Sequence, residues 1–146
     1  MAEEYLADHF PGFPVLPGVM MLECAVETAA WLVRDHFHFA CSLVVLKEAR
    51  QIRYGNFVRP GQTLIVTAEV LRLEALQSEF KIRGTVGADT AIQGRIALTH
   101  LNLADGDPAL AAVDQKLIGR QKALWTTLFS GGCAPQLSAG APPPPR

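Results

Sequence analysis

The most constraining feature of this sequence is a segment near its start that is dense in proline and glycine. Residues 8–18 read DHFPGFPVLPG. Because proline fixes the backbone angle φ and lacks an N–H donor, this segment must be a stiff, non-helical loop. Apolar residues then recur at three- and four-residue spacing from Val19 to about Phe39, which predicts a largely apolar helix. A rigid loop that leads directly into a helix positions the side chains of both accurately.

Four stretches rich in β-branched residues follow the predicted helix, at residues 42–54, 62–73, 78–86 and 91–103. The breaks between them are short and turn-like, so we expect consecutive strands to be antiparallel neighbours. A second helix is predicted over residues 108–129, with Asp107 as its cap and Pro108 as its first residue. One long helix, a β-meander and a C-terminal helix indicate an α+β fold.

Length and composition limit the classes of protein to consider. The chain has 146 residues, which corresponds to one domain, and it is 49% hydrophobic and 18% charged with a net charge of −1. This balance is typical of a globular protein and does not favour a nucleic-acid binder. The three cysteines are widely spaced and suggest neither a zinc site nor a disulfide framework.

The sequence also bears on location and on the domain boundary. The N-terminus has the acidic residues Glu3 and Glu4 and lacks a secretory signal, and no apolar run is long enough to cross a bilayer, so we expect a soluble, cytoplasmic protein. Residues 131–146 include four consecutive prolines and predict a disordered tail after a single domain over residues 1–130.

Three residues of the loop and the first helical turns have side chains or backbone groups suited to acid/base chemistry. The ordinary pKa of histidine is near 6.5, so a neutral His9 on the rigid loop is a candidate base. Apolar surroundings favour the protonated form of a carboxyl group, and Glu23 follows four apolar residues, so it is a candidate acid. The free amide N–H groups at the helix start, at Gly18, are candidate donors to a thioester oxygen.

Residues 9–19, HFPGFPVLPGV, resemble the signature H-F-P-G-x-P-V-x-P-G-V of the FabZ-type (3R)-hydroxyacyl-[acyl-carrier-protein] dehydratases, which is followed by a helical E-x-x-A-Q. A second block, RQIRYGNFVRPGQTLIV at residues 50–66, resembles the strand-turn-strand of that family around its R-P-V-x-P-G-D-x-L motif. The similarity covers about residues 8–103.

The resemblance implies a hot-dog fold, in which a curved antiparallel sheet wraps one long helix and two subunits join their sheets into a dimer or a higher, dimer-based oligomer. It also implies that His9 removes the C2 proton, that Glu23 of the partner subunit helps the C3 hydroxyl to leave as water, and that Gly18, with Val19, binds the thioester carbonyl. The implied substrate is a 3-hydroxyacyl group on acyl carrier protein, in fatty acid biosynthesis. No metal or organic cofactor is implied.

The sequence departs from the family pattern at two places. Glu27 stands where the family has glutamine, one turn beyond Glu23, and this second carboxylate either helps Glu23 to stay protonated or repels it. Only eight residues precede His9, where typical members have a helix and one or two strands. We therefore expect an unpaired sheet edge, unless the dimer covers it or the true start lies upstream.

Other polar residues have simpler interpretations. We interpret His36 and His38 as the polar end of the helix, and Cys24 as a small core residue without a role. Basic residues alternate along the strands, and we interpret them as a solvated face rather than as a surface for an acidic carrier protein. These basic residues are Arg50, Arg53, Arg59, Arg72, Lys81 and Arg83.

Two other functions fit parts of the pattern. A hot-dog thioesterase would use a carboxylate on the helix and the same oxyanion site, but the histidine of the H-F-P-G loop argues against it. A non-catalytic hot-dog module that binds acyl chains or completes a dimer fits the short N-terminus and Glu27. The presence of both His9 and Glu23 favours the dehydratase.

Overall fold

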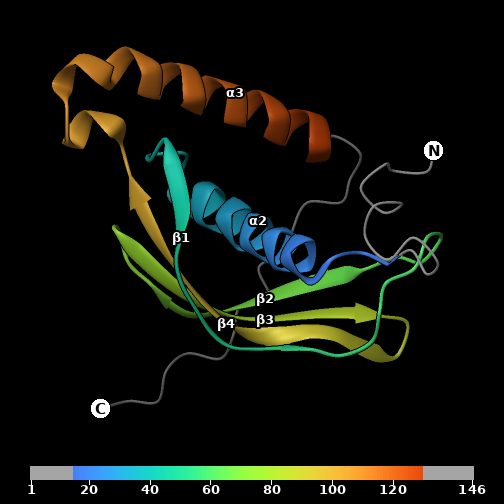
Figure 1. The fold of residues 1–146 in the computed structure, drawn as a ribbon. Coiled ribbons are helices and arrows are strands. Elements are labelled where there is room, and N and C mark those ends of the chain that lie inside the picture. The colour runs from blue at the N-terminus through green and yellow to red at the C-terminus, as the bar shows by residue number, and fades with distance from the viewer. Residues whose placement is uncertain (1–14, 130–146) are drawn as a thin grey trace.

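The computed structural model describes residues 15–129 of the chain and shows one curved sheet with two long helices (Figure 1). Helix α2 spans Gly18–His36, and helix α3 spans Ala111–Phe129. The strands are β1 (Leu43–Tyr54), β2 (Ile65–Leu73), β3 (Gln77–Val86) and β4 (Asp89–Leu101). Two short 3₁₀ turns, Leu103–Asp105 and Pro108–Leu110, join β4 to α3. The expected α+β fold, with a C-terminal helix, is confirmed.

The cap of the second helix is also confirmed, although the helix begins later than expected. Asp107 accepts a hydrogen bond from the backbone N–H of Ala109 at 3.0 Å, as an N-cap side chain should. Pro108 opens a 3₁₀ turn rather than the α-helix itself, which starts at Ala111. The expected tail over residues 131–146 lies outside the described residues.

The sheet order is β1-β4-β3-β2, and every pair of neighbours is antiparallel. The expected neighbours β2–β3 and β3–β4 are confirmed, but the expected pairing of β1 with β2 is wrong. These two strands are the opposite edges of the described sheet. After β1, the backbone N–H groups of Gly55 and Asn56 still donate to β4 carbonyls, at 2.9 and 3.0 Å, so the chain leaves β1 alongside β4 and crosses to the far edge.

Helix α2 lies in the hollow of the curved sheet (Figure 1). Its buried side chains recur at the predicted spacing and include Ala25 and Ala29, both fully buried. Facing them from the sheet are the core residues Phe80, Ile82, Ile92, Ile96 and Leu98. Small residues on the helix let its backbone approach the sheet closely, so large sheet side chains fill the space between the two layers.

Helix α3 packs on α2 from the side away from the sheet, so that sheet, α2 and α3 form three successive layers (Figure 1). The ring of Trp125 in α3 lies 5.6 Å from that of Trp31 in α2 and 6.0 Å from that of Phe39 just after α2. These aromatic contacts hold the outer helix against the central one.

Asp114 ties the start of α3 to the end of the sheet. This buried carboxylate accepts hydrogen bonds from the Ser42 hydroxyl and from the backbone N–H groups of Leu103 and Ala104, the last two at 2.8 Å each. Burial raises the pKa of Asp114, but these three donors outweigh it, and the net pKa lies below the ordinary value. The charged carboxylate therefore stabilises the folded state.

We expect Asp114→Asn to lower the melting temperature by about 5 °C at neutral pH, because the amide NH₂ would face a backbone N–H that needs an acceptor. A depressed pKa gives stability that is present above the unfolded value of about 3.9 and is lost as the pH falls through the lower folded value. The difference from wild type should therefore be constant from pH 7 to about pH 5 and shrink below pH 4. Thermal unfolding followed by circular dichroism at several pH values measures the melting temperatures of both proteins. A difference in melting temperature that stays constant down to pH 2 would contradict this role of Asp114.

His100 is buried on the inner face of β4 and satisfies both ring nitrogens. Its Nδ1 lies 3.2 Å from the Ala75 carbonyl oxygen, and its Nε2 lies 2.8 Å from the Ser78 hydroxyl. Because a carbonyl only accepts, Nδ1 carries the proton and Nε2 accepts from Ser78. Desolvation lowers the pKa of His100, partly offset by the Ala75 carbonyl, so the folded state holds the neutral ring.

A lowered histidine pKa predicts loss of stability on acidification. Well above pH 6.5, His100 is neutral in both the folded and the unfolded state. Below that pH, His100 is protonated in the unfolded state while it stays neutral in the folded state. His100→Gln removes this proton linkage. The difference in free energy of unfolding between wild type and the less stable variant should therefore become smaller between pH 7.5 and pH 5. Urea unfolding midpoints across that range test the expectation, and parallel curves for the two proteins would refute it.

Candidate active site

Two amide groups at the start of helix α2 have no acceptor among the residues that the structure describes. Pro17 precedes it in an extended conformation and supplies no side-chain cap, and its carbonyl accepts from the N–H groups of Met20 and Met21 at 3.0 and 3.2 Å. Within residues 15–129, the N–H groups of Gly18 and Val19 have no acceptor. These free donors lie at the positive end of the helix, where they can bind a carbonyl oxygen that gains negative charge.

Gly18 lies against the ring of Tyr54, the last residue of β1. A Cβ atom on Gly18 would lie only 3.0 Å from Cε1 of Tyr54, so glycine allows this close approach. Tyr54 is half-exposed and flanks the free amide groups. The position of Tyr54 could not be predicted from the sequence, because the end of the helix that it contacts depends on the register of β1.

Glu23 lies on the face of α2 that points away from the sheet. The helix buries its opposite face, and Glu23 is exposed, one turn beyond Val19, whose side chain is 70% exposed. The expected apolar surroundings of Glu23 are therefore not formed by the described part of this chain. The periodicity predicted the helix correctly, but the four apolar residues before Glu23 are distributed over several faces of it.

Glu27 has a basic partner two turns further along the helix. Nη1 of Arg34 lies 4.0 Å from a carboxylate oxygen of Glu27, and the Arg34 guanidinium stacks 4.9 Å from the centroid of the Trp31 ring. The Arg34 side chain is only 10% exposed, and burial lowers its pKa while Glu27 raises it. This pair was not among the predictions from the sequence, although its seven-residue spacing places both residues on one helix face and was a usable signal.

Cys24 is exposed rather than buried, so its interpretation as a core residue is wrong. The pKa of its thiol is raised, by partial burial first and then by Glu23 and Glu27. A raised pKa keeps the thiol protonated near neutral pH, and a protonated thiol is a poor nucleophile. These properties do not suit Cys24 to act as a nucleophile.

Of the four histidines, His100 is the buried core residue described above. His9 lies outside the described residues. His36 is the last residue of α2 and His38 lies in the following turn with a φ of 54°, so their interpretation as the helix end is confirmed. Across residues 15–129, no three His, Cys, Asp or Glu side chains are grouped as metal ligands would be.

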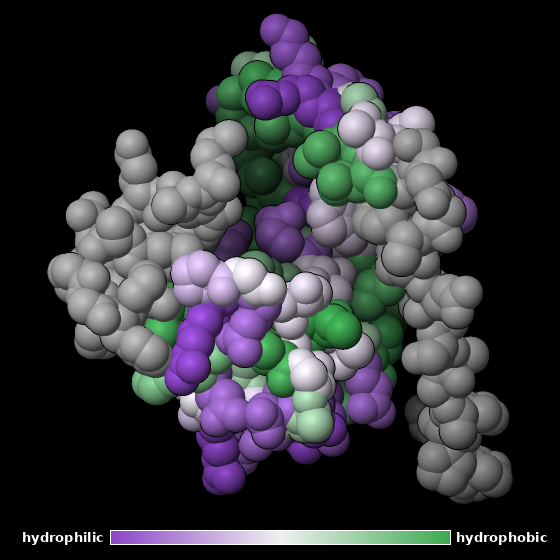
Figure 2. Space-filling model, turned by 90° about the vertical axis from the view of Figure 1, so that its right-hand side faces the viewer, coloured by the Kyte–Doolittle hydropathy of each residue, from purple (hydrophilic) through white to green (hydrophobic). Residues whose placement is uncertain are grey.

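Figure 2 views the molecule from the side where α2 begins and shows a hollow lined by both apolar and hydrophilic side chains. Exposed apolar residues near the helix start and the adjoining loop include Val19, Met20, Tyr54 and Phe57. Of the described helices, neither has the length and apolar character needed to span a membrane.

Comparison with protein families gives a match to the ApeI-like model, described as ApeI dehydratase, over residues 2–95. Among curated proteins, the FabZ 3-hydroxyacyl-[acyl-carrier-protein] dehydratase of Ralstonia nicotianae is 35% identical over 97 residues, which cover 64% of this chain and 59% of the relative. The FabZ protein of Albidiferax ferrireducens is 32% identical over 105 residues, 70% of each chain. The FabZ protein of Levilactobacillus brevis is matched over 60% of its length. The chain thus spans about three fifths of the length of these two relatives, from Ralstonia and Levilactobacillus.

Solved structures identify the fold. The dehydratase heterocomplex ApeI:P from Xenorhabdus doucetiae matches with a TM-score of 0.56 at 17% identity, over 67% of this chain and 68% of that one. A mutant of the fluoroacetyl-CoA-specific thioesterase FlK matches with a TM-score of 0.56 at 19% identity, over 76% and 88%. At these identities the likeness establishes the hot-dog fold alone. The family model matches residues 2–95, which is more than half of the chain. The chain therefore belongs to the ApeI-like dehydratase family.

Proposed function

We propose that this protein removes water from (3R)-hydroxyacyl thioesters on acyl carrier protein, giving the trans-2-enoyl thioester in fatty acid biosynthesis in the cytoplasm. Family membership supports the reaction class. The observation that carries the proposal is the start of α2, where amide groups at Gly18 and Val19 that have no acceptor within residues 15–129 precede a carboxylate at Glu23 by one turn.

In the proposed reaction, His9 takes the proton from C2 while the thioester oxygen gains negative charge. The free N–H groups at Gly18 and Val19 donate hydrogen bonds to that oxygen, and such preorganised donors are typically the largest single contribution to catalysis. Glu23 gives its proton to the C3 hydroxyl, the C3–O bond breaks, and water leaves. The electrons of the C2–H bond become the new C2–C3 π bond, and solvent returns His9 and Glu23 to their starting states.

A homodimer accounts for the exposure of Glu23 in the single chain. A carboxylic acid that is to hold a proton needs apolar surroundings, and the described chain leaves Glu23 open to solvent. Strand β1 is an edge of the described sheet, and its residues Val45 and Leu46 are about 40% exposed. Pairing of two β1 edges would bury these side chains and bring a second subunit close to the exposed face of α2.

Two alternatives remain open. A thioesterase has the support of similar folds only, since FlK and the hexameric acyl-coenzyme A thioesterase are 19% and 11% identical. It would release a free thiol, which dehydration does not. A non-catalytic module would fold and form a dimer without turnover.

The direct test is hydration of crotonyl thioesters, the reverse reaction, followed by loss of the enoyl absorbance. We expect turnover with crotonyl-carrier protein, and a loss of about 100-fold or more in kcat/KM for both His9→Ala and Glu23→Gln, the usual contribution of a positioned acid or base. Thiol release, measured with a chromogenic disulfide, would favour the thioesterase. Absence of turnover from a folded dimer would favour the non-catalytic module.

Glu27→Gln is the matched control for Glu23→Gln, because it makes the same chemical change one turn along the same exposed helix face. We expect its kcat/KM to change by less than about tenfold. A fall in kcat/KM within that limit would indicate that Glu27 assists Glu23. A rise in kcat/KM would indicate that Glu27 repels Glu23. A loss as large as that of Glu23→Gln would refute the assignment of Glu23 as the acid.

A further inference from the structure

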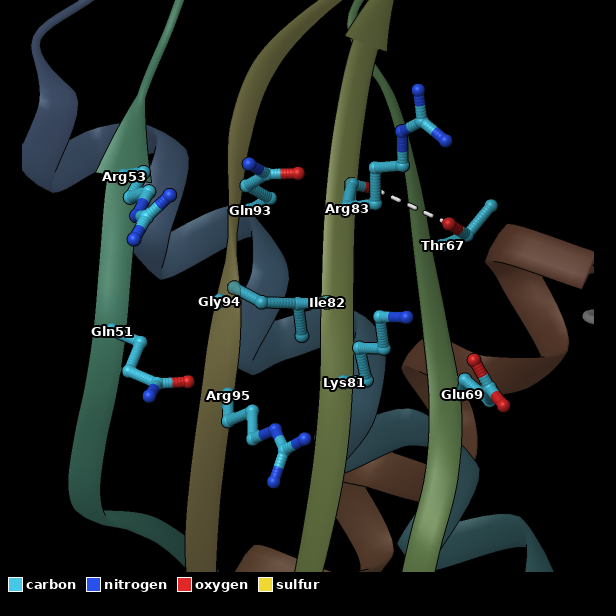
Figure 3. Close-up of a pocket in the computed structure, with 10 residues that line it drawn as sticks. All are labelled: Gln51, Arg53, Thr67, Glu69, Lys81, Ile82, Arg83, Gln93, Gly94 and Arg95. Atoms are coloured by element: carbon cyan, nitrogen blue, oxygen red, sulfur yellow. Dashed lines mark hydrogen bonds between the residues drawn. The ribbon is translucent and has the colours of Figure 1, made fainter.

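Arg34 on helix α2 differs from the other described arginines in its surroundings. Figure 3 shows Arg53, Arg83 and Arg95 on the sheet face that points away from α2, around a shallow depression of about 500 Å³, and all three are exposed. The Arg34 side chain, by contrast, is only 10% exposed. An exposed guanidinium keeps its hydration and needs no protein partner, whereas a buried one depends on the groups around it.

The contact between the two long helices holds Arg34 in place. Its guanidinium stacks 4.9 Å from the centroid of the Trp31 ring, and that ring lies 5.6 Å from the ring of Trp125 in α3. Arg34 belongs to the last turn of α2, where the helix dipole favours a positive charge. Burial lowers its pKa and Glu27 raises it, but the pKa of arginine is so high that the group stays charged. Arg34 is therefore a fixed positive charge at the junction of α2 and α3.

This charge has one ion-pair partner among the described residues. Nη1 of Arg34 lies 4.0 Å from a carboxylate oxygen of Glu27, and the buried Nε of Arg34 has no hydrogen-bond partner in residues 15–129. A buried charge that loses its partner costs more free energy than an exposed one, so the attraction to Glu27 matters more than that of a surface pair. The Glu27 side chain is about half-exposed, and the pull of Arg34 determines where its carboxylate lies.

The pull of Arg34 is directed away from the candidate acid. Glu23 lies four residues before Glu27, and Arg34 lies seven residues after it, so the three share one face of α2 with Glu27 in the middle. Helix residues four apart have Cβ atoms about 5–6 Å apart, which lets the Glu23 carboxyl group donate a hydrogen bond to a free Glu27 carboxylate. Because Arg34 draws the Glu27 carboxylate toward the C-terminal end of α2, it weakens that competing contact.

The competing contact would disturb the proposed proton transfer. A charged carboxylate is a strong hydrogen-bond acceptor, so a Glu27 that turned back would take the hydrogen bond that Glu23 must donate to the C3 oxygen of the substrate. A general acid acts only when its hydrogen bond points at the group that it protonates. A second carboxylate beside Glu23 is therefore compatible with catalysis as long as it is held elsewhere.

We propose that Arg34 is a positioning residue that holds the Glu27 carboxylate away from Glu23 and so keeps the acid directed at the substrate. This inference rests on the proposed function, because it takes Glu23 as the acid. Helix α3 contributes indirectly, since the contact of Trp125 with Trp31 fixes the ring on which Arg34 stacks.

A double-mutant cycle tests whether Arg34 acts through Glu27. We expect Arg34→Gln to lower kcat/KM for hydration of crotonyl-carrier protein about fivefold, mostly through kcat, because the groups that bind the substrate are unchanged. In the Glu27→Gln background the same substitution should change kcat/KM by less than about twofold, since no charged carboxylate is left to turn back. A similar loss in both backgrounds would show that Arg34 acts through folding alone and would overturn the proposal.

Cys24 reports on the same geometry without turnover. Its thiol is exposed, and partial burial raises its pKa, with further increases from Glu23 and Glu27. A Glu27 carboxylate that turns back comes closer to Cys24, three residues before it, so fewer thiols are ionised and alkylation by iodoacetamide slows. We expect alkylation of Arg34→Gln to be about twofold slower than that of wild type, and no slowing in the Glu27→Gln background.

The conditions separate this effect from the direct influence of Arg34 on Cys24. The two residues are ten positions and so about 15 Å apart along the helix, which exceeds the Debye length of about 8 Å at an ionic strength of about 0.15 M. Mass spectrometry of the peptide that contains Cys24 distinguishes it from the other cysteines.

Arg72→Gln is the matched control, because it makes the same change in an arginine that pairs with Glu74 at 2.6 Å outside the candidate active site. It should leave both kcat/KM and the alkylation rate unchanged. Equal alkylation of wild type and Arg34→Gln would overturn the inference that Arg34 holds Glu27, as would equal slowing in both backgrounds. Absence of turnover from wild type would overturn the proposed function, while the alkylation cycle would still decide how Arg34 acts on Glu27.

Discussion

The packing of α2 into the curved sheet is the contact on which the rest of the structure depends. Ala25 and Ala29 are fully buried against a sheet surface of large aliphatic and aromatic side chains. Replacing such a small residue by a larger one in a close-packed interior typically costs about 1–3 kcal/mol, because the helix must move outward or the sheet must flatten. The helix is thereby fixed in both depth and rotation, and its N-terminus is fixed with it.

This rotation determines what the candidate site can do within one chain. Since the apolar stripe of α2 faces the sheet, Glu23 and Glu27 must face away from it. Helix α3 covers only part of that outward face, through Trp125 against Trp31 and near the buried Arg34. The first turns of α2 stay open, with Val19 and Tyr54 exposed beside the free amide groups. The described part of the chain therefore presents free amide groups and a carboxylate without enclosing them, and a second subunit would complete the proposed site.

Local sequence patterns were sufficient to predict the elements and the start of α2, because propensity, helical periodicity and the proline-glycine punctuation agree there. The position of β1 could not be predicted in this way. Short turns favour hairpins between consecutive strands, but β1 pairs with β4. The hydrogen bonds from Gly55 and Asn56 to β4 show that the chain stays beside β4 after β1 ends, instead of turning back along β1. The exposure of Glu23 was missed for a related reason. Apolar neighbours in sequence are distributed around a helix, so they do not surround a side chain in space.

The sheet face that points away from α2 illustrates the same limit for charge. Alternation along β3 predicts that Lys81 and Arg83 point outward, but it cannot predict that Arg95 and Arg50 lie opposite in the same row, since register is a property of the folded sheet. A solvated face normally mixes the two signs, and pairs such as Arg72 with Glu74 on β2 and the turn after it follow that rule. The row of Arg50, Arg95 and Lys81 does not follow it. Like charges opposite one another on neighbouring strands oppose pairing, so this row does not contribute to the stability of the sheet, which comes from the apolar face that packs on α2.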